Sequence, residues 1–160
     1  MPAATPESPP LLPSGLHVRT MKELRAMCVG DFRTSATREK LMSGLERVVE
    51  ELRAIGVPGQ LWIDGSFVTR KVDPNDVDFV LSVDYLWYCD ATKEQRAAVD
   101  LVAEGLKRPP YYCDSYIFPQ WPVGHPLYWY GENQRNYWML QWGFSREGDP
   151  KGIMVVELSP

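Results

Sequence analysis

One stretch near the middle of the chain, residues 62–81, most constrains what the sequence can fold into. It reads as an apolar strand, a Gly65-Ser66 turn, a polar connection, and a second apolar strand that begins with Asp76 and Asp78. Side chains alternate along an extended strand, so two residues spaced by two point to the same face. Adjacent carboxylates repel each other and resist burial as charged groups. The pattern therefore predicts a divalent cation between Asp76 and Asp78.

The residue types around this pair favour magnesium. Magnesium takes oxygen ligands and is commonly held by one or two carboxylates together with substrate phosphates. The Gly65-Ser66 turn offers backbone N–H groups and a hydroxyl to a phosphate placed beside that metal. The stretch thus predicts a site for a metal ion and a phosphate together.

The whole motif also resembles a known family. Gly65-Ser66, nine intervening residues and Asp76-x-Asp78 within apolar flanks are similar to the nucleotidyltransferase signature of the DNA polymerase β superfamily. The similarity is greatest to the minimal nucleotidyltransferases, which have little beyond the catalytic domain. The Asp-Gly-Ser-Phe-Val-Thr run looks like a branch found in bacteria and phages. We expect an α/β (α+β) fold, a short mixed sheet flanked by helices, with the turn and the carboxylates at one sheet edge.

In that superfamily a third carboxylate comes from a later strand beside the first pair. Asp114 is the candidate, because it is a lone acid between apolar and aromatic neighbours in a predicted strand, 111–118. A buried carboxylate needs a compensating partner, and a metal ion would provide one. The alternative is a hydrogen-bonded or solvent-facing strand residue. The resemblance implies that Asp76 and Asp78 hold two Mg²⁺ ions, and that Asp114 binds one of them and accepts a proton.

A nucleoside triphosphate, with ATP expected first, is the substrate that the resemblance implies. Gly65 would let the backbone approach the phosphates, and Ser66 would bind a phosphate oxygen. Thr69 adds a hydroxyl, while Arg70 and Lys71 add two cations that are either triphosphate ligands or solvated loop charges. Arg146 and Lys151 are further candidates for the triphosphate. Asp64 is interpreted as structural, fixing the loop through backbone hydrogen bonds.

Periodicity and capping signals place the remaining elements. Helices are predicted over residues 21–29 with Thr20 as cap, 36–55 with Thr34 or Ser35 as cap, and to about residue 106 with Asp90 or Thr92 as cap. Strands are predicted over residues 60–64, 77–83 and 111–118, and a terminal hairpin over 137–144 and 152–158. The apolar stripe of the second helix comprises Leu41, Leu45, Val48, Val49, Leu52 and Ile55.

Composition sets the outer bounds. Residues 1–15 are rich in proline and predict an extended arm, either loose or packed on the body or a partner, while residues 16–160 predict a single domain. No apolar run approaches the roughly 20 residues that a membrane span needs. Three widely spaced cysteines predict no disulfide framework and fit the cytoplasm. A net charge of −4 disfavours capture of long nucleic acid.

Two classes of function follow. The first is a magnesium-dependent nucleotidyltransferase that moves a nucleoside monophosphate from a triphosphate to a protein or RNA acceptor. Minimal members of the family commonly act in toxin–antitoxin or defence pairs, and the acidic charge favours a protein acceptor over tRNA. The second is a non-catalytic antitoxin or immunity-type binding protein on the same scaffold. It would use the proline-rich arm and the aromatic segment, 118–144, because Trp and Tyr concentrate at binding hot spots.

Overall fold

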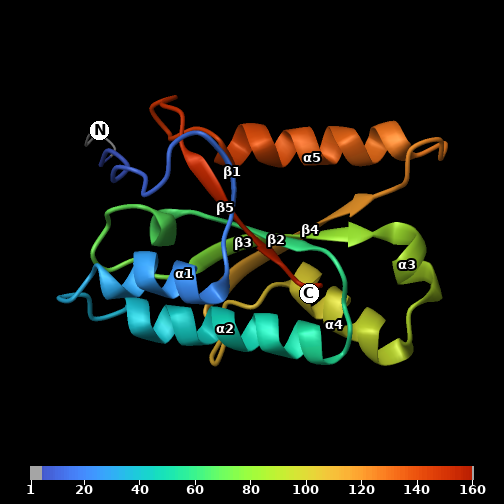
Figure 1. Cartoon of the computed structure of the whole chain (residues 1–160), viewed down its shortest axis with the longest axis horizontal. Helices are drawn as coiled ribbons and strands as arrows, with labels where there is room; N and C mark the ends of the chain where they lie inside the picture. Colours follow the sequence, from blue (N-terminus) through green and yellow to red (C-terminus); the bar gives the residue numbers. More distant parts are fainter. Residues whose placement is uncertain (1–4, 160) are drawn as a thin grey trace.

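A computed structural model describes residues 5–159 and shows a mixed five-stranded sheet between two helical layers (Figure 1). The strand order is β1-β5-β2-β3-β4. Neighbouring strands β5, β2 and β3 are antiparallel, whereas β1 runs parallel to β5 and β4 runs parallel to β3. This confirms the predicted α+β class. The strands are β1 (Gly15–Val18), β2 (Gln60–Asp64), β3 (Val77–Asp84), β4 (Cys113–Gln120) and β5 (Gly152–Glu157).

The helices divide unequally between the two faces of the sheet. Helix α5 covers one face, and α1, α2 and α4 lie on the other (Figure 1). A π-helical turn, Ala26–Gly30, continues α1, and a short 3₁₀ turn, Ser66–Val68, follows β2. Within residues 5–159, no helix is long and apolar enough to cross a bilayer. The helices are α1 (Met21–Arg25), α2 (Arg38–Ala54), α3 (Tyr85–Asp90), α4 (Lys93–Glu104) and α5 (Tyr128–Trp142).

Capping residues explain where several helices begin. Thr20 and Thr92 each form a capping box with the residue three positions later, so both predicted caps are confirmed. Helix α2 starts two residues later than predicted, at Arg38, whose N–H donates to the Ser35 hydroxyl over 3.1 Å. Asp73 in turn accepts from the Ala36 N–H over 2.7 Å, so the approach to α2 is tied to the loop before β3.

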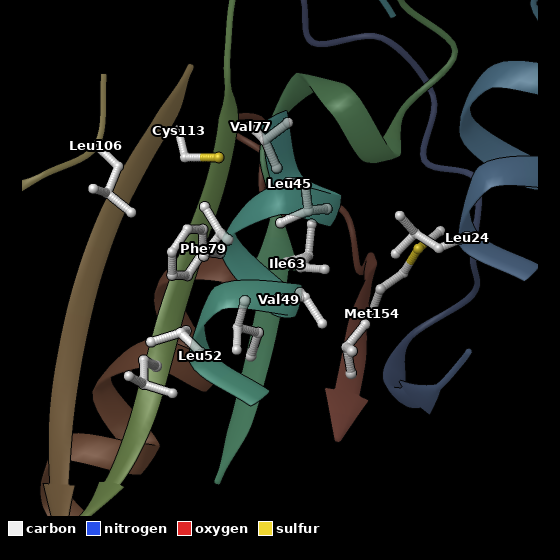
Figure 2. Close-up of a cluster of buried hydrophobic side chains, with 14 of the residues drawn as sticks. Leu24, Leu45, Val49, Leu52, Ile63, Val77, Phe79, Leu106, Cys113 and Met154 are labelled. Carbon is white, nitrogen blue, oxygen red and sulfur yellow. The ribbon is translucent and has the colours of Figure 1, made fainter. Parts of the chain in front are cut away.

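The main core lies between α2 and the sheet. Figure 2 shows Leu45, Val49 and Leu52 of α2 facing Ile63 and Phe79. These residues are nearly or fully buried, which confirms the predicted stripe except at Ile55. Ile55 is 37% exposed because the helix has already ended at Ala54. Burial of a large aliphatic or aromatic side chain contributes about 1.5–3 kcal/mol, so this layer is the main source of stability.

A smaller core under α5 overturns one prediction. Residues 137–144 do not form a strand, because Tyr137 to Trp142 belong to α5, and only Gly152–Glu157 of the predicted C-terminal hairpin is a strand. Helical spacing brings Trp138 and Trp142 onto a cluster of Trp62, Val80, Phe118, Ile153 and Val155. Burial of these rings outweighs the strand preference of aromatic residues, which depends strongly on context. Strand β1 was also not predicted.

The described part of the N-terminal arm packs against the body. Leu12 is 7% exposed, and the Leu11 N–H donates to Val68 O over 3.0 Å. The Arg70 N–H donates to Pro9 O over 2.8 Å, so the arm runs beside the loop that follows β2. Of the two interpretations of residues 1–15, residues 5–14 follow the packed one, while residues 1–4 lie outside the described chain.

One buried arginine fixes that same loop. Arg38 is fully buried, and its guanidinium donates to the carbonyl oxygens of Phe67 at 2.7 Å, Thr69 at 2.8 Å and Lys71 at 2.6 Å. It also donates to Cys28 O over 2.9 Å. The five donors of a guanidinium form a rigid fork, which suits a set of converging carbonyls. Arg38 thus holds α2 and the loop after Gly65-Ser66 in one arrangement.

We expect Arg38→Met to lower the free energy of unfolding by about 3 kcal/mol or more, because several buried carbonyls lose their donor together. Amide hydrogen exchange in residues 66–71 should also become faster. The control is Arg33→Met, which removes an exposed arginine from the same segment and should change stability by less than about 0.5 kcal/mol. Urea denaturation compares the two, and equal stabilities would contradict the role given to Arg38.

Candidate functional site

Three aspartates meet at one end of the sheet. In the strand register, Asp78 is paired with Asp64 of β2 on one side and with Asp114 of β4 on the other. Side chains of residues paired in register project from the same face of a sheet. The face is that of α5, because Trp62, Val80 and Phe118 alternate with the main-core residues on the same strands. The structure therefore brings Asp114 beside Asp78, as predicted, and adds Asp64.

A cavity of about 660 Å³ opens beside these acids. A volume of this size lies within the roughly 300–1,000 Å³ typical of small-molecule sites. Its floor contains the Gly65-Ser66 turn and the carboxylates of Asp76 and Asp78. Its far wall comes from the end of α5 and the turn before β5. The lining residues used below are Glu7, Asp64, Gly65, Ser66, Lys71, Asp76, Asp78, Leu140, Phe144, Arg146 and Lys151.

Gly65 shapes the floor of the cavity. Its φ of +77° and ψ of −166° fall in a region that residues with a side chain rarely adopt. A Cβ at this position would overlap the carboxylate of Asp78. The backbone of the turn and the Asp78 carboxylate can therefore lie in contact only because residue 65 is glycine. Ser66, the next residue, lines the cavity as predicted.

Three residues after the turn, Thr69, Arg70 and Lys71, were predicted to contact the nucleotide, and they occupy different positions relative to the cavity. Lys71 lines the cavity. Arg70 is exposed and is not part of the cavity wall. Thr69 is 1% exposed, and its hydroxyl donates to Ser66 O over 2.7 Å, so it closes the turn. The structure gives the Thr69 hydroxyl a role within the loop, because it also accepts from the Lys71 N–H over 3.3 Å, and the nucleotide contact of Thr69 stays a prediction.

The central carboxylates are electrostatically stressed. Burial, together with the neighbouring Asp76 and Asp114, raises the pKa of Asp78 to about 7. Burial and the Asp114 carboxylate likewise raise the pKa of Asp76. Among residues 5–159, neither Asp76 nor Asp78 has an ion pair, and neither side chain accepts a hydrogen bond. A cation is the partner that would relieve both the repulsion and the desolvation.

Asp114 has other partners. One carboxylate oxygen lies 3.4 Å from the Lys107 ammonium group and accepts from the Tyr116 hydroxyl over 3.1 Å. Asp114 and Lys107 line a neighbouring pocket, and neither residue belongs to the wall of the main cavity. In the described part of the chain, no three His, Cys, Asp or Glu side chains are grouped closely enough to hold a metal ion. Of the predicted three-carboxylate cluster, Asp78 and Asp114 are therefore adjacent in register, but the described residues do not form a closed three-carboxylate group.

The residues present nevertheless fit a hard cation. Asp76 and Asp78 offer carboxylate oxygens without protein partners beside an open cavity, and oxygen donors of this kind are what Mg²⁺ prefers. Asp64 has one buried oxygen, Oδ1, without a hydrogen-bond partner. The donor set that the structure presents is thus the Asp76–Asp78 pair, with Asp64 and Asp114 on either side.

A buried lysine at the edge of the cavity was only a minor candidate from sequence. The Lys151 ammonium lies 3.0 Å from Asp64 Oδ2 and 2.9 Å from Glu7 Oε1. Burial alone would lower the pKa of Lys151, but the Asp64 and Glu7 carboxylates outweigh it and hold that pKa above its ordinary value. Asp64 is structural, as predicted, but through this ion pair. Alternation from Trp62 could have placed Asp64 on the site face, whereas no local signal connects Glu7 to a lysine 144 positions later.

Comparison with known proteins gives one match. The sequence matches the family described as "Family of unknown function (DUF6932)" over residues 4–157. No curated protein and no solved structure matches the chain. The matched region includes most of the arm, the sheet and the whole candidate site, so all of these parts belong to the region that defines the family.

Gly65→Ala should destabilise the protein by about 2–4 kcal/mol, because the methyl group adds an overlap with Asp78 to the cost of the backbone conformation. Gly148→Ala is the matched control. Gly148 has a similar φ of +86°, but a Cβ there meets nothing within 4 Å, so only the conformational cost of about 1–2 kcal/mol remains. Urea denaturation of both variants measures the difference, and equal losses would contradict a contact between the turn and the carboxylate.

Asp78→Asn should stabilise the metal-free protein at alkaline pH. The raised pKa means that the folded state binds a proton that the unfolded state has released. The stabilising contribution of protonated Asp78 is therefore fully present below about pH 4, and it is lost as the pH rises through about 7. The advantage of the variant should grow by about 1–3 kcal/mol from pH 5 to pH 8. Adding Mg²⁺ at pH 8 should stabilise the original protein but not the variant.

The measurement is urea denaturation at both pH values, with a chelator or with excess Mg²⁺. Asp90→Asn, an exposed acid at the end of α3, serves as the control and should show neither effect. A constant difference between Asp78→Asn and the original protein across this pH range would show that Asp78 is not under electrostatic stress.

Proposed function

The chain belongs to the DUF6932 family, and from the geometry of its site we propose that it is a magnesium-dependent nucleotidyltransferase. The observation that carries this proposal is the pair of carboxylates, Asp76 and Asp78, which line an open cavity without a partner among residues 5–159, with Asp78 held against the backbone of Gly65. Transfer of a nucleotidyl group needs mostly positioning and charge neutralisation. The glycine turn would supply positioning, and the carboxylates would hold the divalent ion that neutralises phosphate charge.

In the proposed reaction, an acceptor hydroxyl attacks the α-phosphorus of a nucleoside triphosphate. A new phosphorus–oxygen bond forms, the bond to pyrophosphate breaks, and the hydroxyl proton moves to a base. Asp76 and Asp78 would hold Mg²⁺, which neutralises phosphate charge and acidifies the hydroxyl. The Gly65-Ser66 turn and Lys71 would orient the phosphates. Asp114, in register beside Asp78, is the proposed proton acceptor.

The acceptor and the cellular setting remain proposals from the sequence. A net charge of −4 supports a protein acceptor over a long nucleic acid. ATP is the first nucleotide to test, and a toxin–antitoxin or defence pair is the proposed setting. The three cysteines are free, two of them buried, which agrees with the cytoplasmic location expected for the chain.

A second candidate function, a non-catalytic binding protein, is favoured by one specific observation. The outer side of α5 exposes large aromatic groups that are not part of the cavity wall: Trp129 is 72% exposed and Tyr137 is 53% exposed. Aromatic residues of this kind are enriched at binding hot spots. An antitoxin or immunity-type partner could contact this surface without any use of the cavity.

The proposal is tested with labelled nucleoside triphosphates, Mg²⁺, and either cell lysate or the purified product of the neighbouring gene. Label should pass to a protein or RNA acceptor with the original chain. It should fall by at least about a hundredfold with Asp76→Asn or Asp78→Asn, because removing a group that stabilises the transferring phosphoryl charge costs about two or more decades in rate. Asp90→Asn should retain full transfer.

Equal labelling by the original chain and both carboxylate variants would contradict catalysis at this site. Absence of transfer to any acceptor, combined with neutralisation of a partner that survives both substitutions, would favour the binding protein. In that case Trp129→Ala and Tyr137→Ala should weaken neutralisation.

A further inference from the structure

Glu7, from the N-terminal arm, places its carboxylate in the wall of the candidate site. It lies 2.9 Å from the Lys151 ammonium, which is only 6% exposed. A lysine is rarely buried to this degree unless it is paired. Two carboxylates, Glu7 and Asp64, meet that need here. Glu7 differs from Asp64 in one respect: it comes from an arm and not from the sheet.

The position of the Glu7 carboxylate is built to hold an anion. Its Oε1 accepts from Lys151, and its Oε2 accepts from the backbone N–H of Arg146 over 2.9 Å. An ammonium group and a backbone N–H are also the donors that bind phosphate oxygens. Both donors line the cavity that contains Gly65 and Ser66. A phosphate reaching from that turn toward the α5–β5 connection would meet them.

The arm can release Glu7 without leaving the body. Three backbone hydrogen bonds fix residues 9–12: the Arg70 N–H donates to Pro9 O, the Leu11 N–H donates to Val68 O, and the Gly152 N–H donates to Leu12 O. Before Pro9, the described hydrogen bonds are those of Glu7: its carboxylate contacts, and its own N–H, which donates to Glu147 Oε1 over 3.2 Å. Among the described residues, movement of residues 5–8 is sufficient for the carboxylate to leave.

We infer that Lys151 and the Arg146 N–H form an anion subsite for the polyphosphate tail of the substrate, and that Glu7 occupies it as an internal competitor. The choice of a polyphosphate as ligand rests on the proposed function. Because Glu7 and the polyphosphate share the same donors, each weakens binding of the other by the same factor. Binding of the polyphosphate releases residues 5–8 from the cavity, while residues 9–12 stay in place.

The test uses inorganic tripolyphosphate without divalent metal, measured by calorimetric titration at fixed ionic strength. Glu7→Gln should bind it at least about tenfold more tightly than the original chain, because the competing charge is gone. Glu147→Gln is the matched control. It removes one negative charge near the same segment but keeps a side-chain oxygen that can accept from the Glu7 N–H, and it does not touch Lys151, so its affinity should change by less than about twofold. Lys151→Met should bind at least about tenfold more weakly than Glu7→Gln.

Equal affinities of Glu7→Gln and Glu147→Gln, or weaker binding by Glu7→Gln, would overturn the inference and leave Glu7–Lys151 as a structural ion pair. A second measurement needs no variant. Hydrogen exchange in residues 5–8 of the original chain should become faster when tripolyphosphate is added, and unchanged or slower exchange would contradict displacement. Neither experiment involves nucleotidyl transfer, so loss of transfer with intact displacement would point to failure of the proposed function alone.

Discussion

The contact between the Gly65 backbone and the Asp78 carboxylate is the constraint on which the rest of the site depends. It is set by the pairing of β2 with β3, which puts Asp64 opposite Asp78 and leaves Gly65 just beyond the last paired residue. A side chain at position 65 would occupy the space of the carboxylate. The turn and the acid are therefore a single unit, and the cavity beside them follows from it.

Charge is distributed around that unit in an ordered way. Lys151 and Lys107 stand at the two ends of the row of acids, paired with Asp64 and Asp114 respectively. The middle of the row, Asp76 and Asp78, lacks a cation among residues 5–159. Among the described residues Asp64 still has one buried oxygen without a hydrogen-bond partner, and under the proposed function a divalent ion would relieve the repulsion within the inner pair. Arg38, placed behind the loop, fixes the backbone that faces this pair.

Local signals were sufficient for most of the fold on the α2 side of the sheet. Strand 60–64, the apolar strand that starts at Val77 and the stripe of α2 could be predicted because alternation and helical spacing reflect burial directly. The register that joins Asp78 to Asp114 could be anticipated only through the family resemblance. Residues 137–144 were wrongly predicted to form a strand, because aromatic side chains suit both a strand and a helix. Their state is decided by Trp62 and Phe118, which lie far away in sequence.

The parts of the site that sequence did not predict share a physical cause. Arg38 donates to main-chain carbonyl groups, and because every residue has such a group, the sequence does not show which ones lack a partner. Glu7 and Lys151 pair across almost the whole chain, as do the arm and the turn before β5. Thr69 was predicted as a ligand because a hydroxyl near such a turn can contact either a phosphate or the turn itself. In the structure it donates to Ser66 O in the turn. The Thr69 contact is local, whereas the partners of Arg38 and Lys151 are distant in sequence and are fixed by packing and not by local pattern.

The most direct test of the central claim is a crystal structure of the protein grown with Mn²⁺ and a non-hydrolysable nucleoside triphosphate. Anomalous scattering then locates the metal without ambiguity. The account predicts metal bound by both Asp76 and Asp78, with the phosphates against Gly65 and Ser66. Metal bound elsewhere, or a nucleotide bound away from the Gly65-Ser66 turn, would contradict it.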